Sequence, residues 1–152
     1  MGGRPDRAAR KRSLSRKLAM QALYQWQMTG QTAAELRNQY ATDEGLADAD
    51  ADYFSELLEG VTDAAAALDA SLATLIDRPV VQLDPVERAV LLIGLFELRE
   101  RLDVPYRVVI NEGVELAKRF GATDGHKFVN AVLDRAARSL RAAEQSATAR
   151  VR

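Results

Sequence analysis

The apolar residues of this chain recur every three or four positions, in segments that end near its few prolines and glycines. This spacing places apolar side chains on one face of an α-helix, whereas a half-buried β-strand would alternate with a period of two. Proline resists continuation inside a helix, so Pro79, Pro85 and Pro105 separate successive segments. The pattern therefore predicts an all-α protein.

The segments predict six or seven helices in two groups. We expect helices over residues 13–28, 32–41, 52–76, 85–101, 105–120 and 125–143, with Gly60 bending or breaking the third and Gly30 ending the first. The stretch 77–85 is the candidate boundary, because it contains two prolines. Short connections favour antiparallel neighbours. The prediction is thus two packed three-helix bundles, one over residues 13–78 and one over residues 84–143.

Positive charge is concentrated at the two ends of the chain. Residues 1–17 hold seven Lys or Arg and one Asp, and residues 135–152 hold five Arg and one Glu. Residues 18–134 hold nine basic and twenty acidic side chains. This segregation indicates a polyanion site built from the ends. The alternative is solvated charge alone, with residues 1–12 as a flexible basic arm and residues 144–152 as a disordered tail.

Several classes of function are disfavoured by composition. The chain has no cysteine, which excludes disulfides, thiolate zinc sites and cysteine nucleophiles and favours a reducing compartment. The apolar stretch that follows the basic N-terminal residues contains Gln21, Gln25 and Gln27, so it is too polar for a signal peptide or membrane anchor. His126 is the only histidine, and no phosphate-binding glycine motif occurs. We expect a cytoplasmic protein with no catalytic site, cofactor or metal.

The last predicted helix carries the most informative surface. At 100° per residue its buried stripe contains Val129, Val132, Leu133, Ala136 and Leu140. Phe128 lies at the margin of that stripe, beside Lys127 and Arg135. An aromatic ring next to cations suits single-stranded nucleic acid, because the ring stacks on a base while the cations neutralise phosphate. The alternative is that Phe128 simply widens the core.

The first predicted helix offers a second group of the same kind. Lys17, Gln21 and Tyr24 share one side, a combination that is compatible with nucleic acid, while Trp26 is expected in the core. The preceding cations would contact phosphate with an affinity that depends on salt; they are Arg10, Lys11, Arg12 and Arg16.

Four segments carry a resemblance to a known family. They are ALYQWQ at 22–27, DPVERAVLLIGLFEL at 84–98, DVPYRVVINEGVELAKRFG at 103–121 and HKFVNAVLDRAA at 126–137. Together they resemble the NusB family of bacterial transcription antitermination factors. The resemblance implies a non-enzymatic protein that binds boxA RNA together with NusE, a ribosomal protein of the small subunit. It also implies assembly with NusA, NusG and RNA polymerase to suppress termination in ribosomal RNA operons.

The resemblance also implies which residues form the site. RNA would contact Arg10, Lys11, Arg12, Arg16, Tyr24, Lys127 and Phe128, with Asp124 and Asn130 near the bases. Glu87 and Arg88 would lie at the edge where RNA and NusE meet. The acidic middle of the chain would attract a basic ribosomal partner.

Three alternatives stay open at this point. NusB-like domains also occur fused to RNA methyltransferases, although this chain shows no cofactor-binding segment after the last helix. A helical adaptor could bind proteins without specific RNA recognition. A homodimer could form when NusE is absent.

Overall fold

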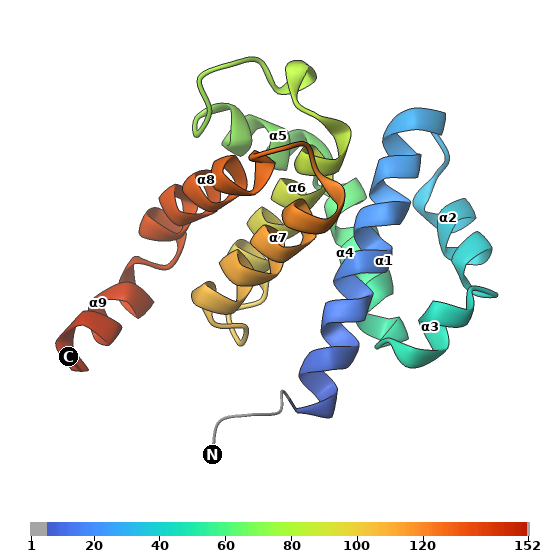
Figure 1. Cartoon of the computed structure of the whole chain (residues 1–152), viewed down its shortest axis with the longest axis horizontal. Helices are drawn as coiled ribbons and strands as arrows, with labels where there is room; N and C mark the ends of the chain where they lie inside the picture. The colour runs from blue at the N-terminus through green and yellow to red at the C-terminus, as the bar shows by residue number, and fades with distance from the viewer. Residues whose placement is uncertain (1–5, 152) are drawn as a thin grey trace. The chain divides into compact units, whose positions relative to one another are not determined.

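The computed structural model describes residues 6–151, and the side chains of residues 6–147 (Figure 1). Its regular elements are α1 Arg7–Thr29, α2 Ala33–Tyr40, α3 Glu44–Asp48, α4 Ala51–Asp63, α5 Ala65–Ala73, the 3₁₀ turn η1 Val80–Gln82, α6 Pro85–Glu100, α7 Tyr106–Phe120, α8 Gly125–Leu140 and α9 Ala142–Val151. The described residues contain helices and no strands, which confirms the all-α prediction. Residues 1–5 of the predicted arm, and residue 152 of the predicted tail, lie outside the described residues.

The chain divides into two compact units. The first unit extends to Asp63 and the second begins at Ala64. This boundary lies earlier than the predicted stretch 77–85, because α5 packs against α6 and so belongs to the second unit. Gly60 does not interrupt α4, which continues to Asp63. Leu57, Leu58 and Val61 around the glycine are all buried. The break falls instead at Ala64, whose backbone leaves the helical region.

Helix α1 begins six residues before the predicted start. The Asp6 side chain accepts a 2.7 Å hydrogen bond from the N–H of Ala9 and so caps the helix. Arginine and alanine, which are good helix formers, then continue it without a breaker. The helix ends as predicted at Gly30, whose φ of 74° is the left-handed conformation that glycine adopts readily.

The first unit is built around contacts that α1 makes with α4, α3 and α2. Its core contains Leu23, Leu36, Phe54, Leu57 and Leu58, all fully buried. A polar link also joins α1 to the start of α4: the Ser15 hydroxyl donates to the carbonyl oxygen of Asp50 at 2.6 Å. The N–H of Asp50 in turn donates to the Ser15 hydroxyl oxygen at 3.0 Å. This reciprocal link fixes where the basic half of α1 lies on its unit.

The second unit has a core in which α6, α7 and α8 all contact one another. Residues 91–98 of α6 are buried without interruption. Leu133 of α8 fits between two glycines, Gly94 of α6 and Gly113 of α7. A Cβ at Gly94 would lie 2.6 Å from Leu133 Cδ2, and a Cβ at Gly113 would lie 2.9 Å from Leu133 Cδ1. The glycines therefore let three helix backbones approach one leucine closely.

A buried arginine closes this unit at the end of α8. Leu140, predicted in the buried stripe, is 40% exposed, while Arg141 beside it is only 4% exposed. The Arg141 guanidinium donates at 2.9–3.1 Å to four main-chain carbonyl oxygens at and just after the end of α6, those of Glu97, Leu98, Arg101 and Val104. The carbonyl oxygens of Glu97 and Arg101 also accept from the N–H groups of Arg101 and Val104, so the guanidinium adds to the main-chain hydrogen bonds that end α6.

Helix α9 follows where the sequence predicted a disordered tail. Its residue Glu144 accepts a 2.6 Å hydrogen bond from Arg141 Nη1 and a 3.0 Å hydrogen bond from the main-chain N–H of Tyr106. The carboxylate thus ties the first turn of α9 to the start of α7. An Ala-rich segment has high helix propensity, and this anchor supplies a fixed starting point.

Candidate nucleic-acid interface

The basic half of α1 presents cations of very different accessibility. Arg10 is exposed, and Lys11 and Arg12 are half-buried. Arg16, in contrast, is 3% exposed. Its Cζ lies 5.5 Å from the centroid of the Tyr53 ring in α4, and Arg12 Cζ lies 4.5 Å from the same centroid. The expectation that Arg16 contacts phosphate does not fit this burial, because positions 12 and 16 are one turn apart and both face α4.

Tyr24 lies on the exposed side of the same helix. It is 42% exposed, whereas its neighbours Ala22 and Leu23 are fully buried. Trp26, expected in the core, is half-buried. We call Arg10, Lys11 and Tyr24 the α1 surface; it offers two cations and an accessible aromatic ring.

The start of α8 brings together the residues that the sequence predicted there. Asp124 precedes the helix with a φ of 64°, a positive value that is unusual for a residue other than glycine. Its Oδ1 lies 3.3 Å from Lys127 Nζ, and both side chains are about 70% exposed. Asn130 is exposed one turn further on. We call Asp124, Lys127, Phe128 and Asn130 the α8 surface.

Phe128 is half-buried, as expected for a residue at the margin of the core stripe. The guanidinium Cζ of Arg78 lies 4.4 Å from the centroid of its ring. Arg78 is exposed and belongs to the connection between α5 and η1. The ring therefore carries a stacked cation on one face.

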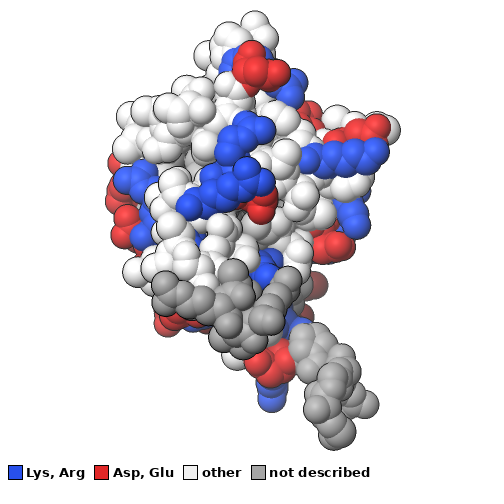
Figure 2. Space-filling model, turned by 90° about the vertical axis from the view of Figure 1, so that its left-hand side faces the viewer, with Lys and Arg blue, Asp and Glu red and all other residues white. Residues whose placement is uncertain are grey.

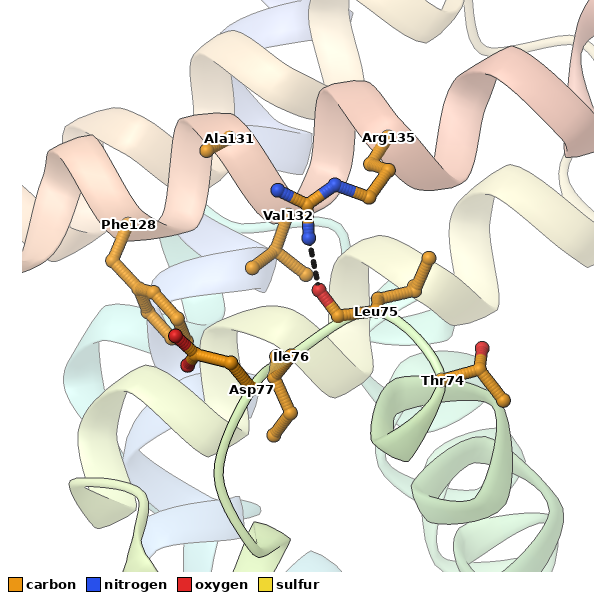
Figure 3. Close-up of a pocket in the computed structure, with 8 residues that line it drawn as sticks. All are labelled: Thr74, Leu75, Ile76, Asp77, Phe128, Ala131, Val132 and Arg135. Atoms are coloured by element: carbon orange, nitrogen blue, oxygen red, sulfur yellow. Dashed lines mark hydrogen bonds between the residues drawn. The ribbon is translucent and has the colours of Figure 1, made fainter.

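A hollow of about 300 Å³ adjoins the Phe128 ring (Figure 3). It is lined on one side by α8 and on the other by residues 74–77 of the connection after α5. Arg135 of α8 spans the hollow and donates to the main-chain carbonyl oxygen of Leu75. Figure 2 shows one face of the molecule, on which Lys and Arg side chains lie among uncharged and acidic ones. The Phe128 ring, one cation, Arg135, and one carboxylate, Asp77, thus border an open hollow on the second unit.

Glu87 and Arg88 are engaged in contacts within the second unit. Glu87 is 7% exposed. Arg88 is half-buried and forms a bidentate pair with Asp69 of α5, with Nε to Oδ1 at 3.1 Å and Nη2 to Oδ2 at 2.5 Å. The Arg88 pair holds α5 against α6. That these two residues lie at the edge where RNA and NusE meet stays a prediction.

Glu87 instead supports the loop that leads into α8. Its Oε2 accepts a long hydrogen bond, 3.4 Å, from the N–H of Ala122. A Cβ added at Gly125 would lie 2.4 Å from the same oxygen, so only glycine fits there without displacing the carboxylate. Burial raises the pKa of Glu87, and Asp84 raises it further, while the Ala122 hydrogen bond and Arg78 act in the opposite direction. Glu87 of α6 thus contacts Ala122 and Gly125, the residues on either side of Asp124, and helps to fix the start of α8.

Arg78 is the residue that sequence reasoning missed. It lies 50 positions before Phe128. No local pattern indicates which helix a cation in a connecting segment will reach. The sequence shows only that Arg78 is a basic residue next to Pro79. It lies within residues 18–134, where acidic side chains outnumber basic ones.

Other kinds of site find no support in the described part of the chain. Among residues 6–151 there is no group of three or more His, Asp or Glu side chains that could hold a metal ion. Within the same residues, no helix combines the length and the apolar character needed to cross a bilayer.

Comparison with known proteins identifies the family. The chain is 56% identical over 138 residues to the transcription antitermination protein NusB of Halorhodospira halophila, covering 90% of this chain and 88% of that protein. Its fold is similar to T. maritima NusB, with a TM-score of 0.75, 27% identity and coverage of 84% and 91% of the two chains. It is also similar to a chain from the crystal structure of antitermination factors NusB and NusE in complex with dsRNA. There the TM-score is 0.68, with 25% identity and coverage of 84% of this chain and 96% of that chain. The family model described as NusB family matches residues 13–138, and the chain therefore belongs to the NusB family.

Proposed function

We propose that this protein is a transcription antitermination factor that binds boxA RNA together with NusE. In this proposal the pair joins NusA, NusG and RNA polymerase in the cytoplasm and supports transcription of ribosomal RNA operons. The protein acts by binding and has no catalytic role. Two surfaces contact RNA: the α1 surface supplies cations and Tyr24, and the α8 surface supplies Lys127, Phe128 and nearby polar groups.

The observation that carries the proposal is the likeness to a NusB crystallised with NusE and RNA. That likeness extends over 84% of this chain, so it includes most of the helical fold and is not confined to one motif. Relatives that are more than half identical bear the same antitermination name. Fold alone would not imply function, but likeness at this level of identity supports a shared role.

The chemistry of the two surfaces supports RNA as the ligand. Single-stranded RNA is recognised by aromatic rings that stack on bases and by cations that neutralise phosphate. Tyr24 is an exposed aromatic residue, Phe128 is a half-buried one with Arg78 over its ring, and Arg10 and Lys127 are exposed cations. Asn130 adds an exposed amide, which can both donate and accept hydrogen bonds at a base edge.

The test is fluorescence anisotropy of a short boxA RNA and of a scrambled RNA, with and without NusE, over a range of salt concentrations. We expect a preference for boxA that strengthens when NusE is present. If about five phosphates are neutralised, log affinity should fall with log salt at a slope of roughly −3.5. Equal binding to both RNAs, unaffected by NusE, would leave a nonspecific basic surface and would contradict the proposal.

A pair of matched variants tests the surface itself. Phe128→Leu removes the ring next to Arg78 but keeps an apolar side chain. Tyr106→Leu removes a half-buried ring at the start of α7 that also lies beside an arginine, Arg107, whose Cζ is 5.7 Å from the ring centroid. We expect Phe128→Leu to weaken boxA binding and Tyr106→Leu to leave it unchanged. Equal loss in both variants would show that the effect comes from the fold and not from a site on α8.

A further inference from the structure

The contact between Arg78 and Phe128 suggests a role for Arg78 that neither the sequence pattern nor the family likeness assigns. The ring is half-buried, the arginine is exposed, and 4.4 Å separates Cζ from the ring centroid. A guanidinium is planar, so at this separation it can lie against an aromatic face. A nucleic-acid base that approached this face of Phe128 would meet the guanidinium first.

Arginine planes are themselves stacking surfaces for RNA bases. The aromatic ring beneath restricts the arginine to fewer conformations, which lowers the entropy lost when a ligand binds. We propose that Arg78 and Phe128 form one RNA-binding element: Phe128 holds the guanidinium plane, and a base of the RNA stacks on the outer face of that plane. This inference rests on the proposed function, because its ligand is the RNA that the protein binds.

The surroundings of Arg78 fit this role. Glu87 is near enough for Arg78 to lower its pKa, so a carboxylate attracts the arginine from the side of α6. Phe128 attracts it from the side of α8. The hollow beside the ring leaves open space next to the stack, with Arg135 across it. The Asp77 carboxylate also lines the hollow, beside the ring. A nucleotide whose base covers the guanidinium would therefore have room for its sugar, with its phosphate directed toward Arg135 and away from Asp77.

A different mechanism makes the opposite prediction. Arg78 could act as a cover that must leave before a base reaches the ring of Phe128. Removing the arginine would then expose the ring and would preserve or improve RNA binding. In the element that we propose, removing the arginine removes the stacking plane and weakens binding.

The experiment measures boxA RNA affinity by anisotropy with NusE present, using the full chain. The variants are Arg78→Ala, Arg78→Lys, Phe128→Leu and the double variant Arg78→Ala with Phe128→Leu. The control is Arg107→Ala, which removes another exposed arginine; its Cζ lies 5.7 Å from the Tyr106 ring centroid and its Nε donates to the Tyr106 hydroxyl. Scrambled RNA is measured in parallel for every protein.

We expect Arg78→Ala to weaken boxA binding about tenfold, as the loss of one stacking contact does. Arg78→Lys should lose most of the same factor, since lysine keeps the charge but has no plane. The double variant should bind no more weakly than the weaker single variant, because the two side chains act as one element. Arg107→Ala should bind as the unmodified chain does.

Other results would overturn the inference. If Arg78→Ala bound boxA as tightly as the unmodified chain or more tightly, the cover mechanism would be favoured. If Arg78→Lys bound as tightly as the unmodified chain, only the positive charge of Arg78 would matter and not its plane. An equal loss in Arg107→Ala would indicate general electrostatics. In all three cases the unmodified chain would still prefer boxA, so the proposed function would stand. If the unmodified chain showed no such preference, the proposed function would fail together with the inference. Arg78 is exposed, so its variants keep the test valid even if Phe128→Leu does not fold.

Discussion

Each unit of the protein contains an arginine close to an aromatic ring, but the two contacts differ in burial. In the first unit, Arg12 and Arg16 approach Tyr53, which is 2% exposed. In the second unit, an exposed Arg78 approaches the half-buried Phe128. A cation near an aromatic face contributes about 0.5 to 1 kcal/mol at exposed sites and more where water is excluded. The same chemistry therefore serves stability in one unit and leaves a surface for a ligand in the other.

A basic segment of sequence can place its cations either in the interior of a unit or on its surface. Arg16 belongs to the most cation-rich part of the sequence and lies in the interior of its unit, whereas Arg78 belongs to the acidic middle and is exposed. Charge density along the chain does not indicate which cations reach a ligand. The side of the helix on which each cation lies, and the burial of the ring beside it, decide that.

Of all the changes, we expect Arg16→Ala to have the strongest effect, which is on stability. Truncation of this buried side chain would leave space between α1 and α4, and we expect it to lower the free energy of unfolding by about 2 to 4 kcal/mol. Urea denaturation measures this change. Arg10→Ala is the matched control on the same helix, and an exposed position should change stability by less than about 0.5 kcal/mol. If Arg16→Ala kept full stability but lost RNA binding, the distinction between the two contacts would fail.

A sharper test exchanges the two rings for leucine. Tyr53→Leu should lower the free energy of unfolding by about 1 to 3 kcal/mol, because a large buried side chain is lost, and should alter RNA affinity only through stability. Phe128→Leu should have a smaller effect on stability and should weaken boxA binding about tenfold. Thermal unfolding and anisotropy on both variants measure the pair. The reverse pattern would place the ligand surface on Tyr53.

A smaller effect is expected from the exposed cations on the two surfaces. Lys127→Ala and Arg10→Ala each remove one cation that we assign to phosphate contact. For each variant the slope of log affinity against log salt should become less steep by about 0.7, the value for one phosphate on a single strand. Arg107→Ala should leave the slope unchanged. A slope that changed for Lys127 but not for Arg10 would confine the RNA to the second unit.

The smallest effect concerns the pH dependence of the second unit. Burial raises the pKa of Glu87 above its ordinary value of 4.5, so the folded protein holds this proton more tightly than the unfolded chain. The contribution of Glu87 to stability is therefore full below pH 4.5 and is lost as the pH rises through the folded pKa. Glu87→Gln cannot ionise. We expect the stability of this variant relative to the unmodified chain to be higher at pH 7 than at pH 4, measured by urea denaturation. An equal difference at both pH values would contradict this prediction.

The sequence predicted the helical class and most helix positions, because periodicity and the positions of proline are local properties. Pro85 opens α6, Gly30 ends α1 and Val129, Val132 and Leu133 are buried, as the pattern indicated. The break at Ala64 depends on how α5 packs, and the early start of α1 depends on the Asp6 cap. Hydrophobic periodicity detects neither of these. The boundary between the units differs from the predicted one for the same reason. Pro79 and Pro85 indicate a turn, but they do not determine that α5, which precedes them, packs against α6, which follows them.

The exposure of the candidate site residues was easiest to predict where they share one short segment. Asp124, Lys127, Phe128 and Asn130 lie within seven positions at the start of α8, and the structure leaves three of them exposed and Phe128 half-buried. Arg16, Glu87 and Arg88 were assigned to an interface, yet the first two are buried and the third is paired with Asp69. Their surroundings come from Tyr53, Ala122 and Asp69, each at least 19 positions away. Contacts over such separations are set by tertiary structure and leave no local signal.

The hydrogen bonds of Arg141 bear on how far a shortened version of this protein can be cut back. The family match ends at residue 138, three positions before this arginine. A chain truncated there would lose the donor that serves the carbonyl oxygens of Glu97, Leu98, Arg101 and Val104. It would also lose Glu144, which fixes the first turn of α7. The smallest version of the second unit that keeps these bonds therefore extends to residue 144, six positions beyond the end of the family match.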